Sequence, residues 1–349
     1  MEEKLQSLDS LLEELCALPG VSGSEEEAAQ GAAALLKGCC AKVETDRNGN
    51  VIGVFRAPQF GEPTVVLDAH LDQIGLTVTG HEPGGFLRVA ACGGMDRRVL
   101  AAQPVRIQGQ TGWLPGVIAS TPPHLSKASE RETVPEITDL LIDTGLTQQE
   151  ATKQIPLGSR VILPAALRRL AGDRVTASAL DDRAGAAAVL GALLLLQPQQ
   201  EELHCGVTAL FSAGEEVNSF GAKTAGYRLN PDLVLAVDVS FAAQPGVAKE
   251  KCGKLGGGPM IGFSPTLTPW VSRRLVETAQ KQNIPYQQEI MGGSTGTNAD
   301  SLSLVRGGRY SGLVSIPQRN MHTPAEIVSL TDLENTAKLL ASYLKEVQW

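Results

Sequence analysis

The chain has 349 residues, of which 42% are hydrophobic, 19% charged and 4% aromatic. This length is enough to bury a sizeable core in one large domain or two ordinary ones, with Ala, Val and Leu filling the interior. The net charge is −8 and no run of Lys or Arg occurs. Nucleic-acid binding therefore has no electrostatic basis in this sequence.

The six cysteines are scattered and form no Cys-x-x-Cys pair. Such scatter is typical of reduced thiols in a reducing compartment rather than of a disulfide framework or a metal site. The N-terminal residues lack a positively charged segment leading into an apolar one, and the longest apolar stretch, 184–196, is too short and too rich in Ala and Gly to span a bilayer. We therefore expect a cytoplasmic protein with no membrane partner.

In chain order, the first elements alternate between helix and strand. Leucines spaced three and four apart predict an amphipathic helix over 2–18, and a second helix follows up to about residue 36. Strong turn residues between two β-branched runs predict a hairpin over 43–55. The apolar run at 64–67 is typical of a strand that is buried on both faces of a parallel sheet.

The pattern changes at about residue 75. Short β-type runs alternate with Gly- and Pro-rich turns until about residue 163, which predicts a small all-β domain, 75–163, inserted into a larger one formed by 1–74 and 164–349. The helix-strand alternation then returns and continues to a closing helix. Alternation of this kind predicts an α/β fold whose sheet is mostly parallel and covered by helices on both faces.

Five apolar runs of the larger domain lead into a histidine or an acidic residue: His70, Asp181, Glu216, Asp238 and His322. In open α/β sheets, ligands bind outside the carboxyl ends of the strands. Two histidines and three carboxylates form a nitrogen and oxygen ligand set that suits zinc or a similar divalent ion. Three carboxylates and one shared hydroxide would cancel the four positive charges of two such ions. Five protein ligands would serve two metals if one carboxylate bridges. The pattern therefore predicts a dinuclear metal site with an activated water.

Each residue also has a structural explanation. A single His at the end of a strand is more often structural, a Glu-Glu pair is more often solvated, and Asp181-Asp182 before a helix is more often an N-cap. The occurrence of all five in this order favours the metal site, with Asp182 as the cap. Glu215 and Glu216 follow one strand side by side, so one of them can bind a cation while the other transfers protons.

The chain resembles the dinuclear-zinc aminopeptidases of the glutamyl-aminopeptidase, or TET (tetrahedral), family, also called deblocking aminopeptidases and often misnamed endoglucanases. The resemblance covers nearly the whole chain. It rests on these motifs: Leu18-Pro19-Gly20-Val21-Ser22-Gly23, Ala69-His70-Leu71-Asp72-Gln73-Ile74-Gly75, Leu180-Asp181-Asp182-Arg183, Gly214-Glu215-Glu216-Val217, Val237-Asp238-Val239 and Met321-His322-Thr323-Pro324-x-Glu326.

The resemblance implies a role for each metal ligand. His70 and His322 would each bind one metal terminally, Asp181 would bridge, and Glu216 and Asp238 would complete the two sites. The cofactors would be two divalent metal ions per subunit, with Zn²⁺ as the first choice and Co²⁺ or Mn²⁺ as alternatives.

The resemblance also implies the catalytic residues. Glu215 would be the general base that activates the metal-bridging water and then passes the proton to the leaving amine. Asp72, two residues after His70, would orient that imidazole without binding the metal itself, as metal-bound histidines usually require. The substrates would be short peptides, cleaved at the N-terminal peptide bond.

At the level of architecture, the resemblance implies a zinc-exopeptidase-like catalytic domain and an inserted PDZ-like domain used for assembly. Members of the family form a hollow tetrahedral dodecamer built from dimers. The chain departs from the family pattern at Asn218, Gln244 and Asn298, and none of these is a predicted metal ligand.

Two other functions compete with the aminopeptidase. One is a dinuclear-metal deacylase or dipeptidase acting on a modified amino acid. The other is a non-catalytic metal-binding assembly protein, against which the intact Glu215 and Asp72 argue. An endoglucanase would need a pair of carboxylates flanking a sugar cleft, usually with aromatic platforms, and the sequence has only three Trp.

Overall fold

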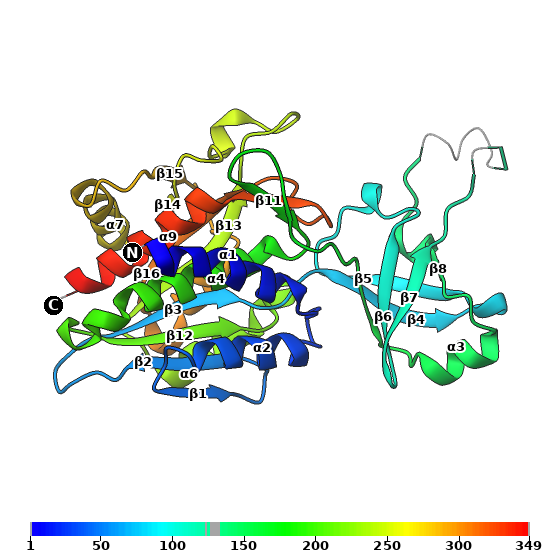
Figure 1. Ribbon diagram of the computed structural model, residues 1–349, viewed down its shortest axis with the longest axis horizontal. Coiled ribbons are helices and arrows are strands. Elements are labelled where there is room, and N and C mark those ends of the chain that lie inside the picture. The colour runs from blue at the N-terminus through cyan, green and yellow to red at the C-terminus, as the bar shows by residue number, and fades with distance from the viewer. Residues whose placement is uncertain (1, 123, 126–132, 348–349) are drawn as a thin grey trace. The chain divides into compact units, whose positions relative to one another are not determined.

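The computed structural model describes residues 2–122, 124–125 and 133–347. The chain divides into two compact units (Figure 1). The larger unit comprises Met1–Asp72, Ala166–Met321 and Ala325–Trp349, and the smaller unit comprises Gln73–Ala165 and His322–Pro324. The sequence pattern predicts an inserted domain over 75–163, with residues 322–324 in the larger domain.

The larger unit is built on an eight-stranded sheet with the order β1-β2-β12-β3-β13-β16-β14-β15. Its strands are β1 (Lys42–Thr45), β2 (Val51–Arg56), β3 (Thr64–His70), β12 (Gly206–Ser212), β13 (Leu233–Phe241), β14 (Met260–Phe263), β15 (Gln287–Ile290) and β16 (Tyr310–Gln318). A second sheet joins β10 (Arg168–Arg169), β11 (Arg174–Ala177) and β17 (Glu326–Ser329).

The large sheet is mixed, with four parallel and three antiparallel pairings between neighbouring strands. Its central strands β12, β3, β13 and β16 run parallel, as the helix-strand alternation predicts. β1 and β2 are antiparallel because a tight turn joins them, and Asp46 fixes that turn by accepting hydrogen bonds from the backbone of Asn48 and Asn50. β2 also runs antiparallel to β12, and β14 to β16.

The larger unit also contains helices. They are α1 (Glu2–Ala17), α2 (Glu26–Leu36), α4 (Leu180–Leu196), α5 (Glu215–Asn218), α6 (Phe220–Leu229), α7 (Pro269–Lys281), α8 (Asn298–Leu302) and α9 (Leu330–Glu346). All of those named here except the short α5 add buried residues to the core clusters of the unit. The first predicted helix and the predicted hairpin are confirmed as α1 and β1–β2. In Figure 1, α1, α4 and α9 lie together over the central strands, and these three helices contact one another.

Alternating side chains of the central strands enter two different clusters. Val65 and Leu67 of β3 belong to the main core, which also contains buried residues of α1, α4 and α9. Val66 instead belongs to a smaller cluster with Leu210 of β12 and Leu302 of α8. Successive side chains of a strand point to opposite faces, so both faces of β3 are covered. This explains why the first half of the strand, residues 65–67, is continuously apolar.

The smaller unit is a closed antiparallel barrel with the order β4-β5-β8-β7-β6-β9. Its elements are β4 (Gly75–His81), β5 (Leu87–Cys92), β6 (Pro104–Gly109), β7 (Gly112–Ile118), β8 (Leu141–Asp143), β9 (Arg160–Ile162) and the helix α3 (Gln148–Gln154). Leu76, Leu87, Ile107 and Ile142 are fully buried in a core of their own. The unit therefore has the internal packing of a separate domain.

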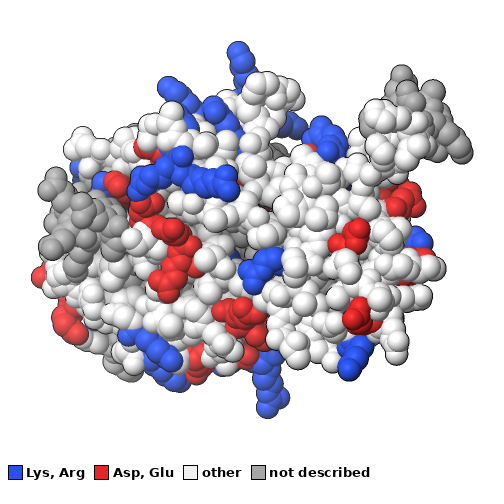
Figure 2. Space-filling model, turned by 45° about the vertical axis from the view of Figure 1, so that its right-hand side comes forward, with Lys and Arg blue, Asp and Glu red and all other residues white. Residues whose placement is uncertain are grey.

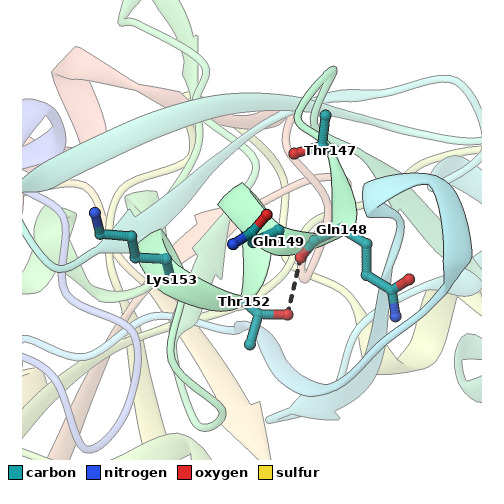
Figure 3. Close-up of a pocket in the computed structure, with 5 residues that line it drawn as sticks. All are labelled: Thr147, Gln148, Gln149, Thr152 and Lys153. Atoms are coloured by element: carbon teal, nitrogen blue, oxygen red, sulfur yellow. Dashed lines mark hydrogen bonds between the residues drawn. The ribbon is translucent and has the colours of Figure 1, made fainter.

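A surface pocket lies on α3 and is lined by Thr147, Gln148, Gln149, Thr152 and Lys153 (Figure 3). Thr152 donates its hydroxyl to the carbonyl of Gln148, and Thr147 caps the helix by accepting from the backbone N–H of Glu150. None of the residues that line this pocket is a predicted site residue. The pocket therefore contributes nothing to the predicted metal site.

The surface of the protein carries charges of both signs. Lys and Arg side chains alternate with Asp and Glu on the face shown in Figure 2. Among the described residues, no helix is both long enough and apolar enough to cross a membrane. All six cysteines lie in the described part of the chain, and none of them forms a disulfide.

The core around β3 gives a test of the packing. Leu67 is completely buried in the main core, so Leu67→Ala should destabilise the protein by about 2–5 kcal/mol through lost burial and an unfilled cavity. The matched control is Leu304→Ala, since Leu304 is 77% exposed and its loss should change the free energy of unfolding by less than about 0.5 kcal/mol. Chemical denaturation measures both. Equal effects of the two substitutions would contradict the assignment of the core.

Candidate metal centre

The parallel central strands bring three of the predicted ligands, His70, Glu216 and Asp238, to one edge of the sheet. His70 is the last residue of β3 and pairs in register with Ser212, the last residue of β12. Asp68 pairs with Ala236 of β13, which places Asp238, two residues further on, level with His70. Glu215 and Glu216 begin the short helix α5 directly after β12. Parallel strands in register therefore collect residues that lie far apart in the sequence.

The imidazole of His70 is buried and has a different environment at each nitrogen. Nε2 lies 3.0 Å from Oδ1 of Asp181 and 4.0 Å from Oδ1 of Asp238. Nδ1 lies 3.0 Å from the carbonyl oxygen of Asp72. Metal-bound histidines are typically fixed in this way, with one ring nitrogen held by an oxygen of the protein and the other directed at the ligand cluster.

Asp72 organises the turn that carries the two glutamates. Its carboxylate is fully buried and accepts hydrogen bonds from the backbone N–H of Glu215 at 2.9 Å and of Glu216 at 3.1 Å. Ser22 donates its hydroxyl to the same carboxylate at 2.6 Å. The nearest carboxylate oxygen of Asp72 is 3.5 Å from Nδ1 of His70. The backbone carbonyl of Asp72 therefore orients the imidazole, while its carboxylate fixes Glu215 and Glu216.

Asp181 and Asp182 are anchored from two directions. The backbone N–H of Asp181 donates to Oε2 of Glu326 at 3.1 Å. Asp182 accepts from the backbone N–H of Gly185 at 2.9 Å and from that of His70 at 3.2 Å. The first of these contacts has the three-residue spacing of a helix cap, and the second ties the start of α4 to the end of β3. A side chain at Gly185 would collide with the Asp182 carboxylate, because its Cβ would lie 2.3 Å from Oδ1.

Gly214 allows the chain to turn from β12 into α5. It adopts a φ of +67°, which favours glycine, and a Cβ at this position would lie 1.9 Å from the Phe220 ring. The Gly-Glu-Glu sequence therefore has a steric requirement at its first residue. This requirement sets the direction in which Glu215 and Glu216 leave the strand.

Two groups of possible metal ligands share His70. The ligand atoms of His70, Asp181 and Glu216 lie within 4.8 Å of one another, and so do those of His70, Asp182 and Asp238. The structure thus brings together four of the five predicted ligands. It also places Asp182 in one of the groups, although the hydrogen bond from the backbone N–H of Gly185 is the one expected of a helix cap.

His322 groups with the smaller unit. Its carbonyl accepts a hydrogen bond from the backbone N–H of Asp96, and its ring lies against Gly94. It belongs to neither of the two ligand groups found among the described residues. Its role as a metal ligand remains a prediction.

The buried acids change one another's protonation. Burial raises the pKa of Glu215 to about 7, and repulsion from Asp181 and Asp72 adds to this effect. Burial also raises the pKa of Asp238 well above its usual value, with a further contribution from Asp181 and Glu215. Burial by itself lowers the pKa of His70, but hydrogen bonds to Asp181 and Asp72 outweigh it and raise that pKa.

This donor set fits a divalent metal ion. Several carboxylates and one imidazole are gathered at a buried site, where their mutual repulsion disfavours the ionised forms. A bound dication would relieve that repulsion, since it supplies positive charge where the carboxylates converge. Oxygen and imidazole ligands together suit zinc and other borderline ions.

Ser22 and Glu326 form hydrogen bonds with predicted site residues, and neither has a role in the sequence-based prediction. Both lie in motifs that carry the family resemblance, but no local spacing rule predicts a contact of Ser22 with Asp72 across 50 residues or of Glu326 with Asp181 across 145. Their presence in those motifs was the available signal.

Glu25 gives a test of the electrostatics beside this site. Its side chain is buried, its Oε1 has no hydrogen-bond partner in the described part of the chain, and burial raises its pKa to about 7. The folded protein therefore holds a proton on Glu25 that the unfolded chain releases near pH 4.3, so this residue lowers stability as pH rises from about 4.3 to 7.

Glu25→Gln should remove that loss. The variant's free energy of unfolding minus that of the unmodified protein should rise by about 1–3 kcal/mol from pH 4 to pH 8.5. This range allows for partial solvent screening. Denaturant titrations at both pH values measure the difference. The control is Glu27→Gln, because Glu27 is exposed and is not among the groups that shift the pKa of Glu25. The same pH dependence in all three proteins would contradict the assignment.

Known proteins resemble this chain over nearly its whole length. The family model for the M42 glutamyl aminopeptidases matches residues 49–339. A putative aminopeptidase from Acetivibrio thermocellus is 33% identical over 344 residues, which cover 97% of this chain and 98% of that protein. The structure of an aminopeptidase from Desulfurococcus kamchatkensis superposes with a TM-score of 0.90 at 34% identity, covering 98% of this chain and 96% of that one.

A third similar protein, the TET1 peptidase of Pyrococcus horikoshii, is described as able to assemble into a tetrahedron or a large octahedral shell. It superposes with a TM-score of 0.86 at 29% identity, covering 97% of this chain and all of that one. The resemblance carried by the sequence motifs is therefore confirmed. The chain belongs to the M42 glutamyl aminopeptidase family and is a hydrolase of the exopeptidase class.

Proposed function

We propose that this protein is a metal-dependent aminopeptidase that hydrolyses the N-terminal peptide bond of short peptides. The observation that carries the proposal is the pair of ligand groups that share His70 at the carboxyl ends of three parallel strands. The position of Glu215 supports it further, because the backbone of this residue is fixed at the same strand end by Asp72.

Four residues of the larger unit, together with His322, would hold two divalent cations. These four are His70, Asp181, Glu216 and Asp238, with Asp181 as the bridging ligand. Zn²⁺ is the first choice, with Co²⁺ and Mn²⁺ as alternatives that the same donor atoms accept. When bound, such ions lower the pKa of a water molecule and polarise the scissile carbonyl. Asp182 supports the site by holding the backbone N–H of His70.

Glu215 would act as the general base and then as the general acid. Burial raises its pKa to about 7, so near neutral pH the carboxylate can accept a proton from the attacking water and return it to the leaving amine. Asp72 binds the backbone N–H of Glu215, and Ser22 in turn binds Asp72. These contacts hold the base in place without using its carboxylate.

We further propose that the protein forms a homo-oligomer, built from dimers into a tetrahedral dodecamer. The assembly described for the Pyrococcus horikoshii relative supports this proposal. The small barrel, which we propose to be PDZ-like, would serve assembly because it has its own core and forms a separate unit. A hollow particle would restrict access to short or unfolded peptides.

Two substitutions separate the base from the ligands. Glu215→Gln should keep both metal ions and lower kcat by at least about 100-fold, because a carboxamide cannot accept the proton. Glu216→Gln should instead lower metal affinity, since it removes a charged ligand. Metal content by mass spectrometry and turnover of a free-amine peptide measure the two effects. Loss of metal from the Glu215 variant would show that this residue is a ligand and not the base.

A peptide library tests the reaction itself. Free and N-acetylated peptides are incubated side by side with the Zn²⁺- or Co²⁺-loaded protein, and again after chelation. Stepwise loss of single residues from free N-termini is expected, with no cleavage once the metal is removed. Cleavage confined to acetylated peptides would instead establish a deacylase. Absence of any cleavage by the metal-loaded protein would contradict a catalytic role.

A further inference from the structure

A partly buried carboxylate outside the ligand groups lies on the same sheet as the metal centre. Glu289, on β15, accepts a hydrogen bond from the hydroxyl of Ser240 on β13 and another, of 2.9 Å, from the hydroxyl of Ser315 on β16. Each of its carboxylate oxygens therefore has one hydroxyl partner. All of these residues belong to the larger unit.

The strand register places Glu289 beside Asp238. Ser315 is the register partner of Asp238 on the neighbouring parallel strand, so both side chains leave the same face of the sheet. Ser240 is two residues beyond Asp238 and also shares that face. Neighbouring strands lie about 4.8 Å apart, and two residues span about 6.6 Å along a strand. The carboxylate that both serines bind is therefore a close neighbour of the proposed metal ligand.

The carboxylate of Glu289 has acceptor positions left for a positively charged group. Among the described residues, no Lys, Arg or His forms an ion pair with it, and an ionised carboxylate offers about four acceptor positions, of which the two serines use two. Burial raises its pKa, whereas both serine hydroxyls favour the ionised form. A carboxylate held in this way is a preformed site for a positively charged group.

The other carboxylates on this face already have roles. Asp238 and Glu216 are proposed as metal ligands, and Glu215 as the base. Asp68 lies on the same face, but it is 1% exposed and closed off from substrate. Glu289 is the remaining carboxylate with access to solvent among these residues.

We propose that Glu289 is a specificity residue that binds an ammonium group of the substrate's N-terminal residue; the proposal rests on the aminopeptidase function proposed above. A peptide offers this chemistry in two places. Every free N-terminus carries an α-ammonium next to the scissile bond, and an N-terminal lysine carries a second ammonium on its side chain. In both cases Glu289 would supply a charge-assisted hydrogen bond.

The experiment compares the metal-loaded protein with its Glu289→Gln variant on two peptides that differ only in an N-terminal Leu or Lys. Gln keeps the size of the side chain and an acceptor oxygen but removes the negative charge. The control is Glu277→Gln, because Glu277 lies exposed on α7. kcat and KM are measured separately, together with metal content and melting temperature.

A rise in KM of about 10- to 100-fold for both peptides, with metal content, melting temperature and kcat maintained, would show recognition of the α-ammonium. A rise confined to the Lys peptide would show recognition of the side-chain ammonium. Unchanged KM values for both peptides, or a loss of bound metal, would overturn the proposal. If the wild-type protein cleaves neither peptide, the aminopeptidase function itself is overturned. If the wild-type protein cleaves both peptides and Glu289→Gln changes nothing, only the proposal about Glu289 is overturned.

Discussion

The buried carboxylate of Asp72 joins three parts of the larger unit that lie far apart in the sequence. It accepts hydrogen bonds from Ser22, near the N-terminus, and from the backbone of Glu215 and Glu216, more than 140 residues away. Its own backbone carbonyl orients His70. Burial of an ionised carboxylate is costly unless hydrogen bonds compensate, and three donors do so here. Asp72 thereby aligns the imidazole through its carbonyl, and the candidate base and a candidate ligand through its carboxylate.

The same sheet face serves both as core and as candidate site. Along β3, Val66 packs into an apolar cluster, Asp68 is buried further along, and His70 reaches the strand end. On β12 and β13 the face changes in the same direction, from Leu210 to Ser212 and from Ala236 to Asp238. Because side chains on one face recur every two residues, a change in residue type along the strand gives an apolar N-terminal part and a polar C-terminal end. The packed apolar part of each strand then fixes the positions of the ligands.

Much of the fold was predictable because its signals are local. Leucine spacing predicted α1, turn residues predicted the β1–β2 hairpin, and a change of pattern near residue 75 indicated a separate β-rich segment. The antiparallel pairing of β14 with β16 was not predicted, because strand direction depends on how the chain returns to the sheet and no local pattern encodes it. The contacts of Ser22 and Glu326 were missed for the same reason.

The sequence by itself determined the kinds of chemistry available, since acidic and histidine residues at the ends of apolar runs point to a metal-dependent hydrolase, and the motifs identify its family. Only the tertiary structure decided how the atoms are used. It showed that the carbonyl of Asp72 contacts the His70 ring, that Asp182 accepts from the backbone of both Gly185 and His70, and that Glu289 accepts from Ser240 and Ser315. These are distances between residues far apart in the chain, and they are set by strand register and side-chain direction rather than by residue type.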